Sequence, residues 1–142
     1  MGNLVLNTDL ASTFAELGSL DGFESDGRSL APLVRGEELP SWRSAILLEA
    51  FLDGKSASGE GEGDEGSRTD QTAFHAVRTG THKYVEHENG EKELYDLTND
   101  PYELENVYES ADPALVEDLK ARLEALRDCS GDGCREAEDV VR

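Results

Sequence analysis

Acid–base or metal chemistry in this chain would have to come from few residue types, and its three histidines are the first candidates. Alternating apolar and polar residues predict strands around His75, His82 and His87. Because successive side chains of a strand point to opposite faces, His75 and His82 share a face but lie far apart along the hairpin, whereas His87 faces the other side. The three imidazoles therefore cannot form one metal site. A histidine opposite Glu86 is more often a surface pair than a general base.

The two cysteines are the next candidates. Cys129 and Cys134 are separated by four residues that include Gly131 and Gly133. With no histidine or further cysteine near them in the sequence, they cannot complete a four-ligand zinc site. A short glycine-containing loop can bring the two sulfur atoms within disulfide distance, and two unpaired thiols near the end of the chain are the alternative.

Other catalytic motifs are missing from the sequence. Neither G-x-S-x-G nor a phosphate-binding glycine loop occurs, and the three closely spaced glycines of residues 59–63 lie in an acidic stretch that repels phosphate. That stretch also fails the ligand spacing of an EF-hand. Arg78 and Lys83 beside Asp96 could hold an anion, but a cross-strand charge cluster is the simpler interpretation. We therefore predict no catalytic residue, no cofactor-binding residue and no metal ligand in this chain.

The large negative net charge of the chain disfavours partners that are themselves negatively charged. The 142 residues carry 32 acidic and 13 basic side chains, a formal charge of −19 with the histidines neutral. Such a chain does not gather phosphates, so nucleic acid and anionic membrane surfaces are poor partners. The length allows one domain or part of one, no apolar run is long enough for a membrane span, and Met1–Leu6 lacks the features of a signal peptide. Lys55–Asp70, rich in glycine, serine and acids, predicts a flexible linker.

The elements that would position these side chains begin with a strand and a helix. Leu4–Leu6 predicts a short buried strand, and Asn7-Thr8-Asp9 supplies capping residues for a helix over Leu10–Leu17 whose apolar side chains share one face. Gly18 is expected to end this helix in the left-handed conformation. Ala45–Phe51 is apolar enough to be a central strand.

Beyond the linker, the pattern predicts three further strands. They are Phe74–Thr79, His82–Glu88 and Lys92–Leu97, joined by two-residue turns at Gly80-Thr81 and Asn89-Gly90. These turns set the register and therefore the faces of the sheet. The predicted pairs are Thr79/His82, Val77/Tyr84 and His75/Glu86 in the first hairpin, and Val85/Leu94, Tyr84/Tyr95 and Lys83/Asp96 in the second.

Both faces of the predicted sheet are partly apolar. One carries Phe74, Ala76, Val85 and Leu94, and the other carries Val77, Tyr84, Tyr95 and Leu97. A helix begins after Asp112 with Pro113 at its first position, and the leucines at positions 115, 119, 123 and 126 form a stripe that can cover one face. We expect the second face to pack on the N-terminal segment and on protein outside this sequence, with a solvated tyrosine face as the alternative.

Two groups of segments resemble a known family, the type I sulfatases. Ala76–Val85, Asn89-Gly90 and Glu93–Val107 are similar to the C-terminal subdomain of these enzymes. Asn7–Phe14 and Asp26–Leu33 resemble the last part of their catalytic α/β domain. The order and spacing agree from about Asn3 to Leu126, with Lys55–Asp70 as a variable insertion.

The resemblance implies an α+β fold in which a small four-stranded antiparallel sheet packs with a C-terminal helix, after a strand–helix remnant of the sulfatase α/β domain. Residues 1–40 would be the end of that catalytic domain, and residues 41–142 the C-terminal subdomain with its flexible acidic linker at 55–70. The cysteine spacing is similar to that of some bacterial members, which favours a Cys129–Cys134 disulfide and an extracytoplasmic parent protein.

In this family a Cys or Ser of a Cys/Ser-x-Pro-x-Arg motif becomes formylglycine, and a calcium ion polarises the sulfate ester. Here neither Cys129 nor Cys134 begins that motif, and no serine does. The resemblance therefore implies a C-terminal sulfatase fragment that is inactive alone, whose partner would be an N-terminal sulfatase catalytic domain. The alternative is a stand-alone acidic interaction module that docks through a face formed by Tyr84 and Tyr95.

Overall fold

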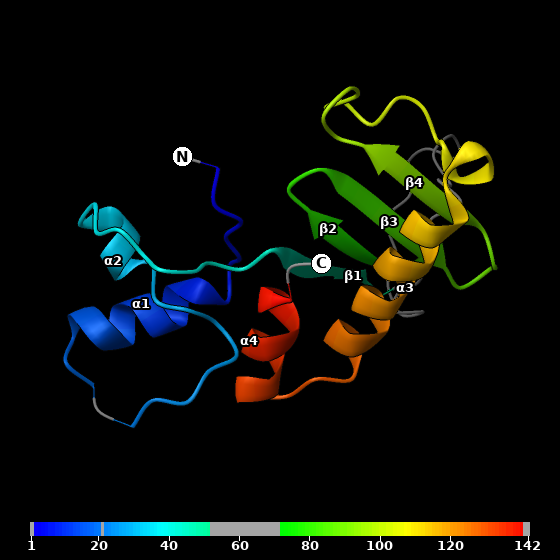
Figure 1. The fold of residues 1–142 in the computed structure, drawn as a ribbon. Coiled ribbons are helices and arrows are strands. Elements are labelled where there is room, and N and C mark those ends of the chain that lie inside the picture. Colours follow the sequence, from blue (N-terminus) through cyan, green and yellow to red (C-terminus); the bar gives the residue numbers. More distant parts are fainter. Residues whose placement is uncertain (1, 21, 52–71, 141–142) are drawn as a thin grey trace, which may run out of the picture.

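The structure is a computed structural model that describes residues 2–20, 22–51 and 72–140. The predicted linker at 55–70 lies outside these residues. Figure 1 shows two parts joined by an extended segment: a sheet covered by one long helix, and a pair of short helices beyond α4, Asp132–Asp139. Within the described residues no helix is long and apolar enough to cross a membrane.

The sheet has four antiparallel strands in the order β1-β2-β3-β4. Their bounds are Ala45–Ala50, Phe74–Thr79, His82–His87 and Lys92–Asp96, close to the predicted strands. Val77 lies opposite Tyr84 and His75 opposite Glu86, so the predicted register of the first hairpin is confirmed.

The predicted register of the second hairpin is wrong by one residue. Tyr84 pairs with Leu94, and Lys83 pairs with Tyr95. The reason is the turn: the His87 amide donates to the Glu91 carbonyl, and the Gly90 amide donates to the His87 carbonyl, which leaves three residues in the loop.

Only Gly90 in this loop has a positive φ, at 90°. The two-residue type I′ turn that Asn89-Gly90 suggested needs a positive φ at both residues, whereas a three-residue loop needs it at the glycine alone. A shift of one residue moves side chains to the other face. Leu94 therefore joins Tyr84, Tyr95 lies on the opposite face, and the predicted Tyr84/Tyr95 face does not exist.

The core lies between one face of the sheet and α3, which spans Pro113–Arg127. The predicted cap is confirmed, since the Asp112 carboxylate accepts a hydrogen bond from the Ala114 amide at 2.9 Å. Val77, Tyr84 and Leu94 are fully shielded from solvent. They pack against the predicted leucine stripe, of which Leu119, Leu123 and Leu126 are buried and Leu115 is partly buried.

The N-terminal part contains α1, Asp9–Leu17, and α2, Ala31–Val34. The helix at Leu10–Leu17 is confirmed, but residues 4–6 form no strand, and Gly18 has a φ of −85° instead of a left-handed value. These two helices lie on the far side of α4 from the sheet, so they do not cover its second face (Figure 1).

Two short elements complete the fold. The 3-10 helix η2, Tyr108–Ser110, follows β4, and the outer edge of β4 is closed by the Val107 amide, which donates to the Leu94 carbonyl. The helix α4, Asp132–Asp139, lies between the sheet and the N-terminal helices. It contacts α3 and β1 of the sheet part, and Arg28 of the N-terminal part donates to its Glu138 carboxylate and Arg135 carbonyl.

Candidate functional site

The histidines do not converge on one site. His75 lies 2.8 Å from Glu49, and His87 lies 3.2 Å from Glu93 on the other face. His82 contacts the Thr81 hydroxyl at 2.9 Å. In the part of the chain that the structure describes, no three His, Cys, Asp or Glu side chains stand close enough to hold a metal ion.

The cationic pair Arg78 and Lys83 surrounds a carboxylate of the chain itself. Lys83 donates to Glu103 at 2.6 Å, and Arg78 lies 3.7 Å from the same carboxylate. Asp96 pairs with His82 instead of Lys83, and its carboxylate accepts the Thr98 and Asn99 amides in the following turn. The two cations are therefore a cross-strand charge cluster.

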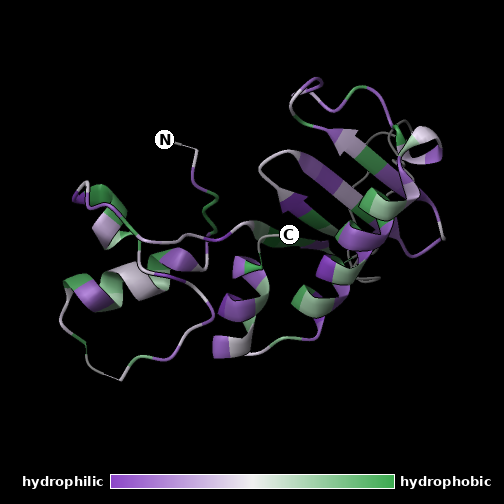
Figure 2. Cartoon of the chain, viewed as in Figure 1, coloured by the Kyte–Doolittle hydropathy of each residue, from purple (hydrophilic) through white to green (hydrophobic). Residues whose placement is uncertain are grey.

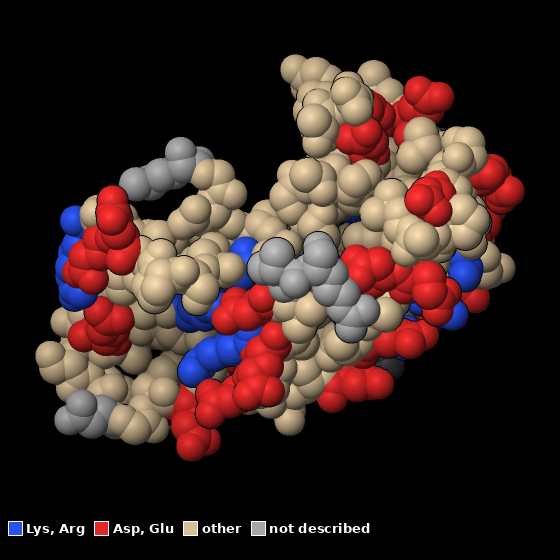
Figure 3. Space-filling view, viewed as in Figure 1, with Lys and Arg blue, Asp and Glu red and all other residues tan. Residues whose placement is uncertain are grey.

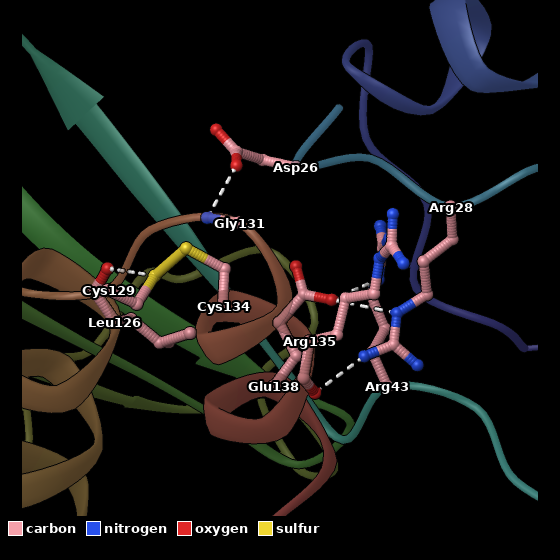
Figure 4. Close-up of a disulfide and its surroundings, with 9 residues drawn as sticks. All are labelled: Asp26, Arg28, Arg43, Leu126, Cys129, Gly131, Cys134, Arg135 and Glu138. Carbon is pink, nitrogen blue, oxygen red and sulfur yellow. Dashed lines mark hydrogen bonds and ion pairs between the residues drawn. A yellow bond between two sulfur atoms is a disulfide. The ribbon is translucent and has the colours of Figure 1, made fainter. Parts of the chain in front are cut away.

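A different group of charged side chains gathers where the two parts of the molecule meet. We call Asp9, Arg28, Arg43 and Glu138 the junction cluster. The Arg43 guanidinium donates two hydrogen bonds of 2.7 Å to the Asp9 carboxylate, and both side chains are completely shielded from solvent. Arg28 donates to Glu138 at 3.0 Å, and the Arg43 Nε lies 3.1 Å from the same carboxylate (Figure 4).

The two carboxyl groups of the junction cluster respond to it in opposite ways. Burial alone would raise the pKa of Asp9, but hydrogen bonds from Arg43 and from the Arg28 and Leu6 amides outweigh burial and lower it. Burial dominates at Glu138 and raises its pKa, although Arg43 and Arg28 oppose this, and the nearby Asp9 adds to it. Glu138 is therefore the carboxylate that is more costly to keep ionised.

Local features of the N-terminal part bring Asp9 to this position. Gly27 is buried against the chain just before α1, where a Cβ atom would lie 2.3 Å from the Thr8 carbonyl oxygen. This close approach allows the Ser12 hydroxyl to donate to the Gly27 carbonyl and the Arg28 amide to donate to Asp9. Asp9 thus holds the loop as well as the start of the helix.

Trp42 fixes the approach of the chain to β1. Its indole donates to the Leu4 carbonyl at 2.7 Å. The guanidinium groups of Arg28 and Arg43 lie 6.0 and 5.5 Å from the ring centroid, within the range of a cation–π contact. The two arginines of the junction cluster therefore contact the Trp42 ring as well as the two carboxylates.

A disulfide attaches α4 to the end of α3. Cys129 and Cys134 are bonded, with an S–S distance of 2.03 Å. Beyond the disulfide, the Gly131 amide donates to Asp26 (Figure 4). Arg135 also donates to the Ser25 carbonyl. Ser44, just before β1, donates its amide to the Glu138 carbonyl at 2.7 Å. α4 thereby holds the N-terminal loop on one side and β1 on the other.

The N-terminal helices leave a large apolar surface open. The predicted apolar face of α1 is exposed, with Phe14 at 67% and Leu17 at 60% of their full accessibility. We define the N-terminal apolar surface as these two residues together with Leu10, Leu20, Phe23 and Val34, all of which are exposed. Figure 2 shows hydrophobic residues on α1 and α2, in the part of the molecule distant from the sheet.

The junction cluster suits positioning, not catalysis. Arg28 and Arg43 both lie at ion-pair distance from carboxylates of the chain itself, although the buried Arg43 Nε makes no hydrogen bond. Sequence reasoning gave Asp9 only a capping role and Arg43 none, because 34 residues separate the two partners.

Residues 1–129 match the family described as "N-sulphoglucosamine sulphohydrolase, C-terminal". This chain belongs to the sulfatase family. Its α+β fold, with the four-stranded sheet and its covering helix, is consistent with the C-terminal domain of a sulfatase.

Named relatives agree with this assignment. The sulfatase chain is 30% identical to bovine N-acetylglucosamine-6-sulfatase, in an alignment that covers 93% of this chain and 27% of the relative. It therefore spans about a quarter of the length of the curated relatives that it matches.

Solved structures of sulfatases and related hydrolases share the fold. One, described as a complex with its substrate D-glucosamine-2-N,6-O-disulfate, has a TM-score of 0.67 at 19% identity over 90% of this chain and 24% of its own. The phosphonate monoester hydrolase of Agrobacterium radiobacter has a TM-score of 0.61 at 33% identity over 84% of this chain and 24% of its own.

Proposed function

We propose that this sulfatase domain is the C-terminal domain of an enzyme that hydrolyses sulfate esters of glucosamine, where it packs against the catalytic domain. We also propose that it has no hydrolytic activity alone. The glucosamine assignment is supported by the name of the bovine relative. The proposed inactivity is supported by the sequence, in which no cysteine or serine begins the Cys/Ser-x-Pro-x-Arg motif of the family. In the parent enzyme, nucleophile and calcium ligands would come from the catalytic α/β domain.

The observation that carries this proposal is the N-terminal apolar surface. Phe14 and Leu17 project from a helix that is anchored on its other side through the buried Asp9. Since the sulfatase relatives are about four times longer than this chain, the catalytic α/β domain is the partner that we propose for this surface. In this proposal, the predicted boundary near residue 40 separates α1 and α2, which would pack with the catalytic domain, from the sheet that follows.

The first experiment measures hydrolysis. The purified chain is incubated with 4-nitrophenyl sulfate and with glucosamine 6-sulfate, each with and without calcium. We expect no sulfate release in any of the four mixtures. Turnover by homogeneous material would contradict the proposal, because it would require a nucleophile within these 142 residues.

The second experiment measures docking. The catalytic portion of bovine N-acetylglucosamine-6-sulfatase that precedes the matched region is co-expressed with the tagged chain. We expect co-purification with the wild-type chain and loss of it with Phe14→Asp. The matched control is Tyr102→Asp, since Tyr102 is 81% exposed but lies on the loop after β4, away from α1. Capture that is unaffected by Phe14→Asp and lost with Tyr102→Asp would place the interface elsewhere.

A further inference from the structure

We propose that α4 and the Cys129–Cys134 disulfide form a redox-sensitive clasp that holds α1 and its loop against the sheet domain. Unlike the proposed function, this inference concerns attachment within the chain and needs no catalytic domain. It rests on the contacts of α4 on its two sides.

One side of α4 binds the N-terminal part. Glu138 accepts Arg28, Asp139 lies 2.7 Å from the Arg28 guanidinium, and Arg28 also donates to the Arg135 carbonyl at 2.7 Å. The loop that follows α1 is held as well, because the Gly131 amide donates a hydrogen bond to the Asp26 carboxylate at 2.9 Å. Figure 3 shows basic side chains concentrated between the N-terminal helices and the acidic surface of the rest of the molecule.

The other side of α4 binds the sheet domain. The Ser44 amide and hydroxyl both donate to the Glu138 carbonyl, and the hydroxyl also lies 2.8 Å from the Val140 carbonyl. Glu138 therefore takes part in both sets of contacts, with its side chain toward Arg28 and its backbone toward β1. A displacement of α4 would disturb both.

The position of α4 depends on the disulfide. With eight residues, α4 is shorter than the ~12–15 residues that an isolated helix needs to be marginally stable in water. It follows a turn at Gly131 with a φ of 55°, and among its described residues only Glu138 is buried. By contrast, the buried leucines of α3 hold that helix against the sheet. Because the disulfide joins Cys129, just after α3, to Cys134 in α4, it restricts the movement of α4 relative to α3.

The disulfide is accessible to a reductant. Both cysteines are partly exposed, and they line a groove that also touches Leu6, Asn7 and Leu47. A dithiol can enter by this route: its thiolate attacks one sulfur, the Cys129–Cys134 bond breaks, and a mixed disulfide forms. The second thiol of the reductant then resolves the mixed disulfide, which leaves two cysteine thiols and an oxidised, disulfide-containing reductant.

Reduction would release α4 and loosen α1 without dissolving the core. The hydrogen bonds between Arg43 and Asp9 remain, but Arg28 and Arg43 lose the Glu138 carboxylate that ties them to α4. The hydrophobic core between the sheet and α3 contains neither cysteine, and from α4 only the partly buried Ala137 packs against it, among the residues that the structure describes. The expected result is faster local opening of α1 and of residues 25–28, with the sheet unchanged.

Amide hydrogen exchange tests the clasp. The oxidised protein, the protein reduced with dithiothreitol and the Cys129→Ser/Cys134→Ser variant are compared under native conditions. In both altered forms we expect exchange in α4, residues 25–28 and α1 to rise at least tenfold, while β3 and α3 keep their protection. Adding dithiothreitol to the double variant should change nothing, which controls for other effects of the reductant.

Two results would overturn the proposal. Unchanged protection of α1 and residues 25–28 after reduction would show that their attachment is independent of the disulfide. An equal loss of protection in β3 and α3 would show that the disulfide stabilises the whole fold and does not act as a local clasp.

Discussion

Arg43 and Asp9 form a bidentate ion pair in which neither side chain has any solvent exposure. Their positions in the chain place them on opposite sides of the junction, at the start of α1 and just before β1. The pair therefore links the start of α1 to the segment just before β1.

Arg43→Met should destabilise the protein strongly. The substitution keeps an aliphatic side chain but leaves the Asp9 carboxylate buried without its main partner, so we expect the free energy of unfolding to fall by about 3–5 kcal/mol in urea denaturation. Arg35→Met is the control, because Arg35 pairs with Glu16 at the surface and should contribute little. Similar losses in the two variants would contradict the assigned role of the buried pair.

The pH dependence of stability should separate Glu138 from Asp9. Folding raises the pKa of Glu138 above its ordinary value of 4.5, so the folded state binds the proton more readily and stability falls as the pH rises from about 4.5 through the folded pKa. As the pH falls from 7 to 4.5, the wild type should therefore gain stability relative to Glu138→Gln. A constant difference between the two proteins over this range would refute the assignment.

Asp9 should show the opposite dependence. Because its folded pKa lies below the ordinary value of 3.8, its contribution is complete above that pH and is lost as the pH falls through the folded pKa. Urea denaturation at a series of pH values below 4 should show the wild type losing its advantage over Asp9→Asn. A wild-type advantage that grows with acidification would contradict the assignment.

Gly27→Ala should distort the contact between the loop and α1. The added Cβ would stand 2.3 Å from the Thr8 carbonyl oxygen, a backbone atom that cannot rotate away, and overpacking of this kind costs roughly 1–3 kcal/mol. Gly133→Ala is the matched control in α4, where a Cβ meets nothing within 4 Å. Thermal denaturation should show a lower midpoint for the first variant and no loss for the second.

Tyr84→Phe should cost more than Tyr95→Phe. Tyr84 is fully buried and its hydroxyl donates to Glu86 at 2.7 Å, so we expect a loss of roughly 1.5–3 kcal/mol in the free energy of unfolding. Tyr95 is partly exposed on the opposite face, and its hydroxyl donates to Glu93 at 3.0 Å. A larger loss for Tyr95→Phe would contradict the register described above.

Alkaline titration offers a second readout on the same pair. Burial and the Glu93 hydrogen bond raise the pKa of Tyr95 to about 12, whereas burial and Glu86 raise that of Tyr84 further. Ultraviolet difference spectra of the wild type and Tyr95→Phe should assign the phenolate that forms near pH 12 to Tyr95. If the same step persists in Tyr95→Phe, the assignment is wrong.

Local patterns in the sequence predict much of the fold. The strands at Phe74–Thr79 and His82–His87, the first hairpin register and the capped leucine helix after Asp112 all agree with the structure. Each depends on residues near one another in the chain, whose backbone preferences and side-chain periodicity act over a few positions.

The second hairpin shows where a local signal is incomplete. Asn89-Gly90 is compatible with a turn of either two or three residues, and the choice changes every facing pair in the strand that follows. Burial of Leu94 against α3 accompanies the three-residue loop. The face that contacts the helix thus depends on packing beyond the turn.

Sequence alone therefore predicted the four strands of the sheet and the long helix, but not the structure of residues 4–6. It also showed the lack of a sulfatase nucleophile motif and the resemblance to the family, because these are properties of neighbouring residues or of ordered motifs. Only the tertiary structure decided that Asp9, Arg43 and Glu138 meet, since they come from segments that no local preference links. Burial lowers the local dielectric constant and so strengthens the electrostatic interactions among these side chains. Burial is a property of the folded chain as a whole.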